Sequence, residues 1–154
     1  MKGNMYRELF AAEVTSDLEG KTVRIAGWIE QIRNLGTNLM FLVIRDETGT
    51  IQVISNKPEE FNGVTRESTI TLEGIVRKRT KEMINPNMKT GDIELELVSF
   101  EILGKCLTTL PFEINHPEKA SEETRLKYRY LDLRNEKHHN MVLFRSKVID
   151  YIRT

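Results

Sequence analysis

The sequence has few of the features that mark several common classes of protein. It has one cysteine, Cys106, in 154 residues, so no internal disulfide can form and a disulfide-rich secreted domain is excluded. Its longest apolar run, LMFLVI at residues 39–44, is far shorter than the roughly 18 to 20 residues that span a bilayer. Nothing before Met5 resembles a signal peptide, so we expect a cytoplasmic protein.

The chain also lacks an excess of charge of either sign. Lys and Arg together number 23, and Asp and Glu together also number 23. No overall field therefore attracts a polyanion, and a nucleic-acid site would have to come from a local basic cluster.

Motifs for catalysis and for metal binding are missing as well. No P-loop, GxGxxG or GxSxG pattern occurs. His138 and His139 are adjacent, which points them about 100° apart on a helix, and no Cys pair or HExxH spacing completes a metal site. Cys106 has no His nearby in sequence, which favours a packed or hinge thiol over a nucleophile. We expect no catalytic residue, metal or cofactor in this chain.

What the sequence does contain is a run of segments in which apolar and polar residues alternate, the mark of strands with one solvated face. Gly27 interrupts the first segment, as a bend or bulge would. Five antiparallel strands with a connector between the third and fourth are typical of an OB-type Greek-key barrel, whereas a β-sandwich would need about seven. The expected strands cover residues 22–33, 39–46, 51–55, 68–79 and 93–104.

The character of the sequence changes after Gly104. Residues 105–119 contain two prolines and no clean periodicity, so we expect a barrel domain over residues 1–104, a linker over 105–119 and a helical appendage over 120–154. Ser121 is a candidate helix N-cap. In the helix after it, Leu126, Tyr130 and Leu133 fall at i, i+4 and i+7. A second helical stripe, Met141, Phe144, Val148 and Ile152, runs to Thr154 without a stop signal, so we expect the natural protein to continue.

The segment TKEMINPNMKTGD, residues 80–92, is too long for a simple hairpin, because such loops usually take two to five residues. OB barrels hold single-stranded nucleic acid on the face of their second and third strands and on flanking loops. Arg33, Phe41 and Gln52 fall on that part of the predicted barrel, and a basic run at residues 77–81 lies before the loop. Taken singly, Phe41 is equally consistent with a core residue, and the basic run with a solvated strand end.

Four segments carry a family likeness: VRIAGWIEQIRNLG, FLVIRDETGTIQVI, INPNMKTGDIE and RLKYRYLDLR. Together they resemble the N-terminal anticodon-binding domain and hinge of bacterial-type aspartyl-tRNA synthetase, from about Tyr6 to Thr154. The RYLDLR segment is shared with the lysyl and asparaginyl enzymes. So is the pattern formed by GW in the first segment and RD in the second. The INPNMKTGDIE loop is specifically similar to the bacterial aspartyl type.

The resemblance implies roles for individual residues. Phe41 matches the aromatic residue that stacks on the central anticodon base, and Arg33 and Gln52 match polar residues that contact this base. Arg79, Asn85 and Glu94 match positions that face the flanking anticodon bases. Lys78 and Lys81 are expected to contact phosphates. Position 83 is a methionine in this chain, whereas some family members carry an amide side chain there.

For the parent protein, the resemblance implies an aspartate–tRNA ligase that uses ATP and Mg²⁺, binds tRNA(Asp) and forms a homodimer. The family's catalytic FRxE and GxGxGxxR patterns are absent from this sequence, so we expect the chain to bind tRNA without charging it. Two alternatives remain open. One is a free-standing OB module that binds single strands or a protein partner, and the other is an asparaginyl or lysyl relative.

Overall fold

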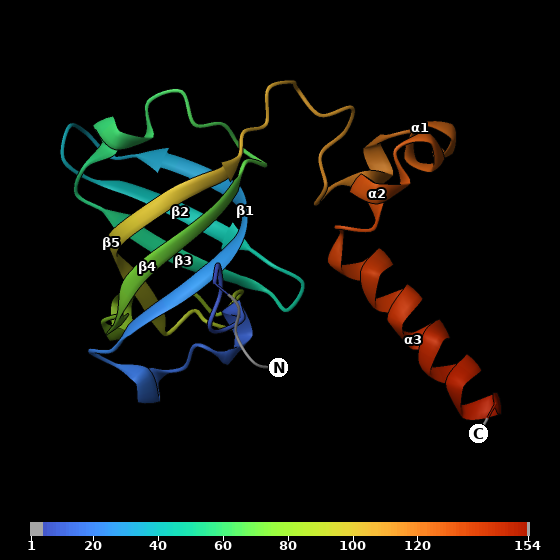
Figure 1. Cartoon of the computed structure of the whole chain (residues 1–154), viewed down its shortest axis with the longest axis horizontal. Coiled ribbons are helices and arrows are strands. Elements are labelled where there is room, and N and C mark those ends of the chain that lie inside the picture. Colours follow the sequence, from blue (N-terminus) through green and yellow to red (C-terminus); the bar gives the residue numbers. More distant parts are fainter. Residues whose placement is uncertain (1–4, 154) are drawn as a thin grey trace. The chain divides into compact units, whose positions relative to one another are not determined.

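Five strands form a closed barrel in the computed structural model, which describes residues 5–153 (Figure 1). The barrel order is β1-β2-β3-β5-β4. The strands lie where the alternation predicts them, which confirms a mainly β, five-stranded OB-fold barrel. Their bounds are Thr22–Asn34 for β1, Met40–Arg45 for β2, Thr50–Ser55 for β3, Thr69–Lys78 for β4 and Ile93–Gly104 for β5.

Most neighbouring strands pair antiparallel, but the pair that closes the barrel does not. β1 pairs with β2 and β4, β2 with β3, and β4 with β5, all antiparallel. β3 and β5 pair in parallel through Val53 with Leu95 and Ile54 with Glu96. The prediction of five antiparallel strands is therefore wrong for this one contact, since alternation along each strand carries no information on its direction relative to a distant partner.

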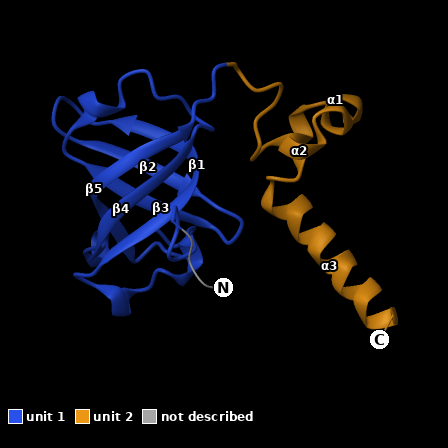
Figure 2. Cartoon of the chain, in the orientation of Figure 1, with its two compact units in different colours: residues 1–107 blue, residues 108–154 orange. Residues whose placement is uncertain are grey.

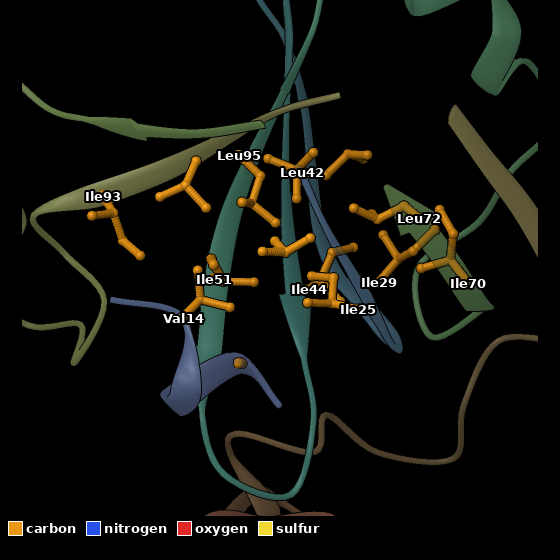
Figure 3. Close-up of a cluster of buried hydrophobic side chains, with 14 of the residues drawn as sticks. Val14, Ile25, Ile29, Leu42, Ile44, Ile51, Ile70, Leu72, Ile93 and Leu95 are labelled. Carbon is orange, nitrogen blue, oxygen red and sulfur yellow. The ribbon is translucent and has the colours of Figure 1, made fainter. Parts of the chain in front are cut away.

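The barrel interior is filled by the apolar half of each alternating strand (Figure 3). Ile29, Leu42, Ile51 and Leu95 are fully buried there. Each such side chain stabilises the fold by about 1.5 to 3 kcal/mol relative to an exposed one. Val14 and Phe61, from segments outside the strands, belong to the same cluster.

Gly27 does not mark the bulge that its position in the first strand suggested. The register shift in β1 lies between Ile29 and Gln31. A Cβ atom on Gly27 would instead lie 2.4 Å from the carbonyl oxygen of Arg45. Gly27 is therefore required by a close approach between β1 and the end of β2.

Short 3-10 helices occupy the connections. In chain order they are η1 Ala11–Glu13, η2 Ser16–Leu18, η3 Pro58–Phe61, η4 Lys81–Met83 and η5 Pro117–Lys119. η4 lies inside the long loop between β4 and β5, and η5 lies after the barrel.

The helices after the barrel are α1 Glu122–Lys127, α2 Arg129–Asp132 and α3 Glu136–Arg153. Ser121 caps α1 as predicted, because its side-chain oxygen accepts a hydrogen bond from the Thr124 amide. The predicted stripe along this segment is wrong. Leu126 and Tyr130 are exposed, and Leu131 packs instead with Phe112 and Ile114. The chain leaves helical geometry at Tyr128, with φ −109° and ψ 46°, which changes the face presented by α2.

The chain divides into two units, Met1–Leu107 and Thr108–Thr154, coloured separately in Figure 2. The first unit contains the barrel and the second contains α1 to α3. The predicted α3 stripe is exposed in the second unit, with Phe144 69% and Ile152 75% accessible. Among the described residues, no helix is long and apolar enough to cross a membrane.

Candidate nucleic-acid interface

A cavity of about 560 Å³ opens on the barrel beside the long loop between β4 and β5. All six residues predicted to contact bases line it. They are Arg33, Phe41, Gln52, Arg79, Asn85 and Glu94. Four strands and the loop contribute to this set, so the barrel fold brings together residues that are far apart in sequence.

Strand register explains how Phe41 reaches the cavity. Met40 and Leu42 on either side of it are buried in the barrel core, so Phe41 points to the opposite face of β2 and is only half-buried. Gln52 alternates in the same way between buried Ile51 and Val53 on β3. The alternative that Phe41 is a core residue is thereby excluded.

The segment over residues 80–92 is a folded loop held by its own backbone. The Asn85 amide donates to the Gly91 carbonyl at 3.1 Å, and the Gly91 amide donates to the Met88 carbonyl at 3.0 Å. The Asn85 side-chain oxygen accepts from the Asn87 amide at 3.0 Å, an Asx turn. The side-chain oxygen of Asn85 thus shapes the loop, and the residue lines the cavity.

A hydrogen bond from Thr90 fastens the loop to the barrel, and Gly91 is required within the loop itself. The buried hydroxyl of Thr90 donates to the Thr50 carbonyl at 2.7 Å, which joins the loop to the start of β3. A Cβ atom on Gly91 would lie only 1.8 Å from the Asn85 carbonyl oxygen. Glycine at position 91 is therefore a steric requirement of the loop.

Arg79 is the most buried charged group of the cavity. Its side chain is 4% exposed, and its Nε lies 3.4 Å from the Glu94 carboxylate. Burial lowers the pKa of the Arg79 guanidinium, and the carboxylates of Glu94 and Asp92 oppose this effect. Nε and Nη2 of Arg79 have no hydrogen-bond partner within the described part of the chain. Buried donors of this kind are costly when unpaired, so the nearby Glu94 carboxylate is needed to offset the burial of the Arg79 charge.

Gln31 is a cavity residue that sequence reasoning missed. Its side-chain oxygen accepts a hydrogen bond from Nη2 of Arg33 at 2.8 Å, and both residues line the cavity. Residues two apart on a strand share a face, so the position of Arg33 was the signal that could have identified Gln31. Gln31 restricts the orientation of the Arg33 guanidinium before any ligand binds.

Beneath the cavity, a buried ion-pair cluster ties β1 to the connection before β4. Arg45 lies between Glu30 at 3.1 Å and Glu67 at 2.7 Å, with all three side chains nearly inaccessible. Glu67 has a positive φ of 64°, which a non-glycine residue rarely adopts. Glu30 also lines the cavity, so this cluster supports its wall.

The two predicted phosphate contacts are placed differently from the base-contacting set. Lys78 pairs with Glu19 at 2.8 Å, and this pairing raises the pKa of Lys78. Lys81 lies exposed in η4. Neither lysine lines the cavity, and both lie on the strand and loop that lead into it. Their contact with phosphate stays a prediction.

Two methionines of the loop add apolar surface to the cavity. Met83 is 63% exposed and Met88 is half-buried, and both line the cavity. Among residues 5–153, no group of three or more His, Cys, Asp or Glu residues could hold a metal ion.

A comparison with protein-family models matches residues 23–103 to the OB-fold nucleic acid binding domain. Among proteins of known sequence, the chain is 44% identical over 155 residues to an aspartate–tRNA(Asp/Asn) ligase of Pelagibacter ubique, which covers 98% of the chain and 26% of that protein. It is 40% identical over 146 residues to an aspartate–tRNA ligase of Lactobacillus johnsonii, which covers 91% of the chain and 23% of that protein. The chain thus spans about a quarter of the length of these relatives.

Among solved structures, the chain is similar to the asparaginyl-tRNA synthetase of Pyrococcus horikoshii complexed with asparaginyl-adenylate. The TM-score is 0.77 and the sequence identity is 29%, over 94% of this chain and 33% of that one. The similarity in fold therefore extends beyond the barrel.

Proposed function

We propose that this chain, which belongs to the OB-fold nucleic acid binding domain family and is homologous to aspartate–tRNA ligases over nearly its whole length, recognises the anticodon of a tRNA. The observation that carries the proposal is the single cavity lined by Arg33, Phe41, Gln52, Arg79, Asn85 and Glu94. An aromatic ring, amides, guanidinium groups and a carboxylate are the groups that recognise unstacked bases.

The chemistry of the cavity suits a single-stranded loop of RNA better than a duplex. Unstacked bases present a face for stacking on Phe41 and edges for hydrogen bonding with polar side chains. A base that stacks on an aromatic side chain gains about 1 to 3 kcal/mol of binding free energy. An anticodon loop supplies such bases next to one another.

The parent protein is proposed to be an aspartate–tRNA ligase that charges tRNA(Asp) with the help of ATP and Mg²⁺ in the cytoplasm, as a homodimer. The proposal rests on homology to ligases of which this chain spans about a quarter.

Binding of RNA stem-loops to the 154-residue chain tests the proposed function. Stem-loops with the aspartate anticodon GUC and the lysine anticodon UUU share their stems and their central base. We expect tighter binding of GUC, because the flanking positions face Arg79, Asn85 and Glu94. Equal affinity for both would contradict anticodon recognition and would favour an OB module that binds single strands without preference.

A second candidate, recognition of the asparagine anticodon GUU, is favoured by two of the comparisons. The relative from Pelagibacter ubique is named a ligase for both tRNA(Asp) and tRNA(Asn), and the similar structure from Pyrococcus horikoshii is an asparaginyl-tRNA synthetase. A GUU stem-loop in the same titration separates the two specificities. Equal binding of GUC and GUU indicates that the chain accepts both tRNAs.

A further inference from the structure

The Glu94 carboxylate holds two other groups of the cavity in place. Its Oε2 atom accepts a hydrogen bond from the Gln52 side-chain nitrogen at 3.2 Å. The same oxygen lies 3.4 Å from Nε of Arg79. Glu94 thus joins β5 to β3 on one side and to the residue that follows β4 on the other.

The contact with Glu94 decides which end of the Gln52 amide is offered to a ligand. A glutamine amide donates through nitrogen and accepts through oxygen, and its partners determine its orientation. An ionised carboxylate only accepts, so the Gln52 nitrogen must face Glu94. The Gln52 side-chain oxygen accepts no hydrogen bond from any residue that the structure describes. Because Gln52 lines the cavity, it presents a hydrogen-bond acceptor there.

Arg79 contacts the same carboxylate from the other side. Its side chain is only 4% exposed, so solvent screens its attraction to Glu94 little. This attraction holds the Glu94 carboxylate next to Gln52.

We infer that Glu94 is a positioning residue that makes the cavity selective at the base contacted by Gln52, in favour of a base edge with an N–H donor. Uracil carries such a donor at N3, whereas cytosine has an unprotonated acceptor nitrogen at the same place. Cytosine would set two acceptors against each other and leave both without a donor. The inference rests on the proposed function and adds to it a base-selective effect that Glu94 exerts through Gln52.

Glu96 provides a matched control on the same strand. It lies two residues beyond Glu94 on β5, and its carboxylate pairs with Nε of Arg77 at 2.9 Å, with a side chain 46% exposed. Glu96 does not line the cavity. Glu94→Gln and Glu96→Gln therefore remove the same charge from the same face, and only the first removes the group that orients Gln52.

The test titrates the 154-residue chain and its variants with stem-loops that differ only in the central anticodon base, GUC against GCC. Wild type is expected to prefer GUC by about tenfold or more, the effect of a buried acceptor left without its donor. In Glu94→Gln the ratio falls toward equality, because the two amides can bond in either orientation. In Glu96→Gln the wild-type ratio is retained. Thermal melting of each variant confirms that it is folded.

Each failure has a separate meaning. If wild type prefers GUC over UUU but binds GUC and GCC equally, the inference is overturned and anticodon recognition stands. If Glu94→Gln weakens both complexes by the same factor and keeps their ratio, Glu94 does not act through Gln52. If Glu94→Gln is unfolded, the test passes to Gln52→Leu, which removes the acceptor itself and must abolish the preference between GUC and GCC. Absence of any preference between GUC and UUU contradicts the proposed function itself.

Discussion

Arg33 of β1 lies directly opposite Phe41 of β2 in the antiparallel register. Both side chains line the same cavity, so a guanidinium and an aromatic ring face a ligand from adjacent strands. Gln31 accepts a hydrogen bond from Arg33, which restricts where the guanidinium can point. A base stacked on Phe41 would therefore present its edge to a donor that is already oriented.

Phe41→Ala is expected to weaken binding of a GUC stem-loop by about 1 to 3 kcal/mol, the cost of one lost stacking platform. Phe41→Tyr keeps an aromatic face and should bind within a few-fold of wild type. Because Phe41 is outside the barrel core, the melting temperature of Phe41→Ala should stay close to that of wild type. Fluorescence anisotropy with a labelled stem-loop measures the first effect and circular dichroism the second. Full affinity in Phe41→Ala would rule out stacking at this position.

Gly91→Ala is expected to disrupt the loop over residues 80–92, since its Cβ would lie 1.8 Å from the Asn85 carbonyl oxygen. Overpacking of this kind costs about 1 to 3 kcal/mol, and here it displaces Asn85 from the cavity. Gly104→Ala is the matched control, because its Cβ would meet only Thr69, at an ordinary 3.6 Å. Gly91→Ala should lose affinity for the GUC stem-loop while Gly104→Ala keeps it. Equal affinities would show that the loop conformation has no part in binding.

The strands could be predicted from the sequence because their signal is local. Alternation located all five strands, and the family likeness selected the six residues that the structure brings to one cavity. The parallel pairing of Val53 with Leu95 has no local signal, because it depends on how the barrel closes. The burial of Arg79 and its contact with Glu94 likewise arise from packing between distant segments.

The error in the helical segment has a similar cause. A regular helix over residues 121–134 would place Leu126, Tyr130 and Leu133 on one face. The non-helical ψ of 46° at Tyr128 separates α1 from α2, so Leu131 becomes the buried residue. Nothing in the local composition indicates this break, because neither Gly nor Pro is present there.

Stability at acidic pH should depend on Glu73. The hydrogen bond from Arg24 and then that from Ser99 lower the pKa of Glu73 below its ordinary value of 4.5. A carboxyl with a lowered folded-state pKa stabilises the fold above its unfolded pKa, and this contribution is lost as the pH falls through the folded-state value. Glu73→Gln should therefore be less stable than wild type at pH 7, and the difference should shrink below pH 4.5. Urea denaturation across this range measures it, and a constant difference would contradict the linkage.

Asp132→Asn is expected to destabilise the second unit. The Asp132 carboxylate is fully buried and accepts hydrogen bonds from Arg129 and from Nδ1 of His138, the latter at 2.8 Å, so it joins α2 to the start of α3. Nη1 of Arg125 lies 3.9 Å away and loses the same partner.

Losing a hydrogen bond to a charged group costs about 1.5 to 3 kcal/mol. The helical circular dichroism signal should therefore melt at a lower temperature in Asp132→Asn than in wild type. Glu123→Gln, which removes an exposed carboxylate from α1, should melt close to wild type. Because the barrel contains no α-helix, its near-ultraviolet signal from Trp28 should be unchanged by Asp132→Asn. A shared loss of both signals would mean that the two units unfold together.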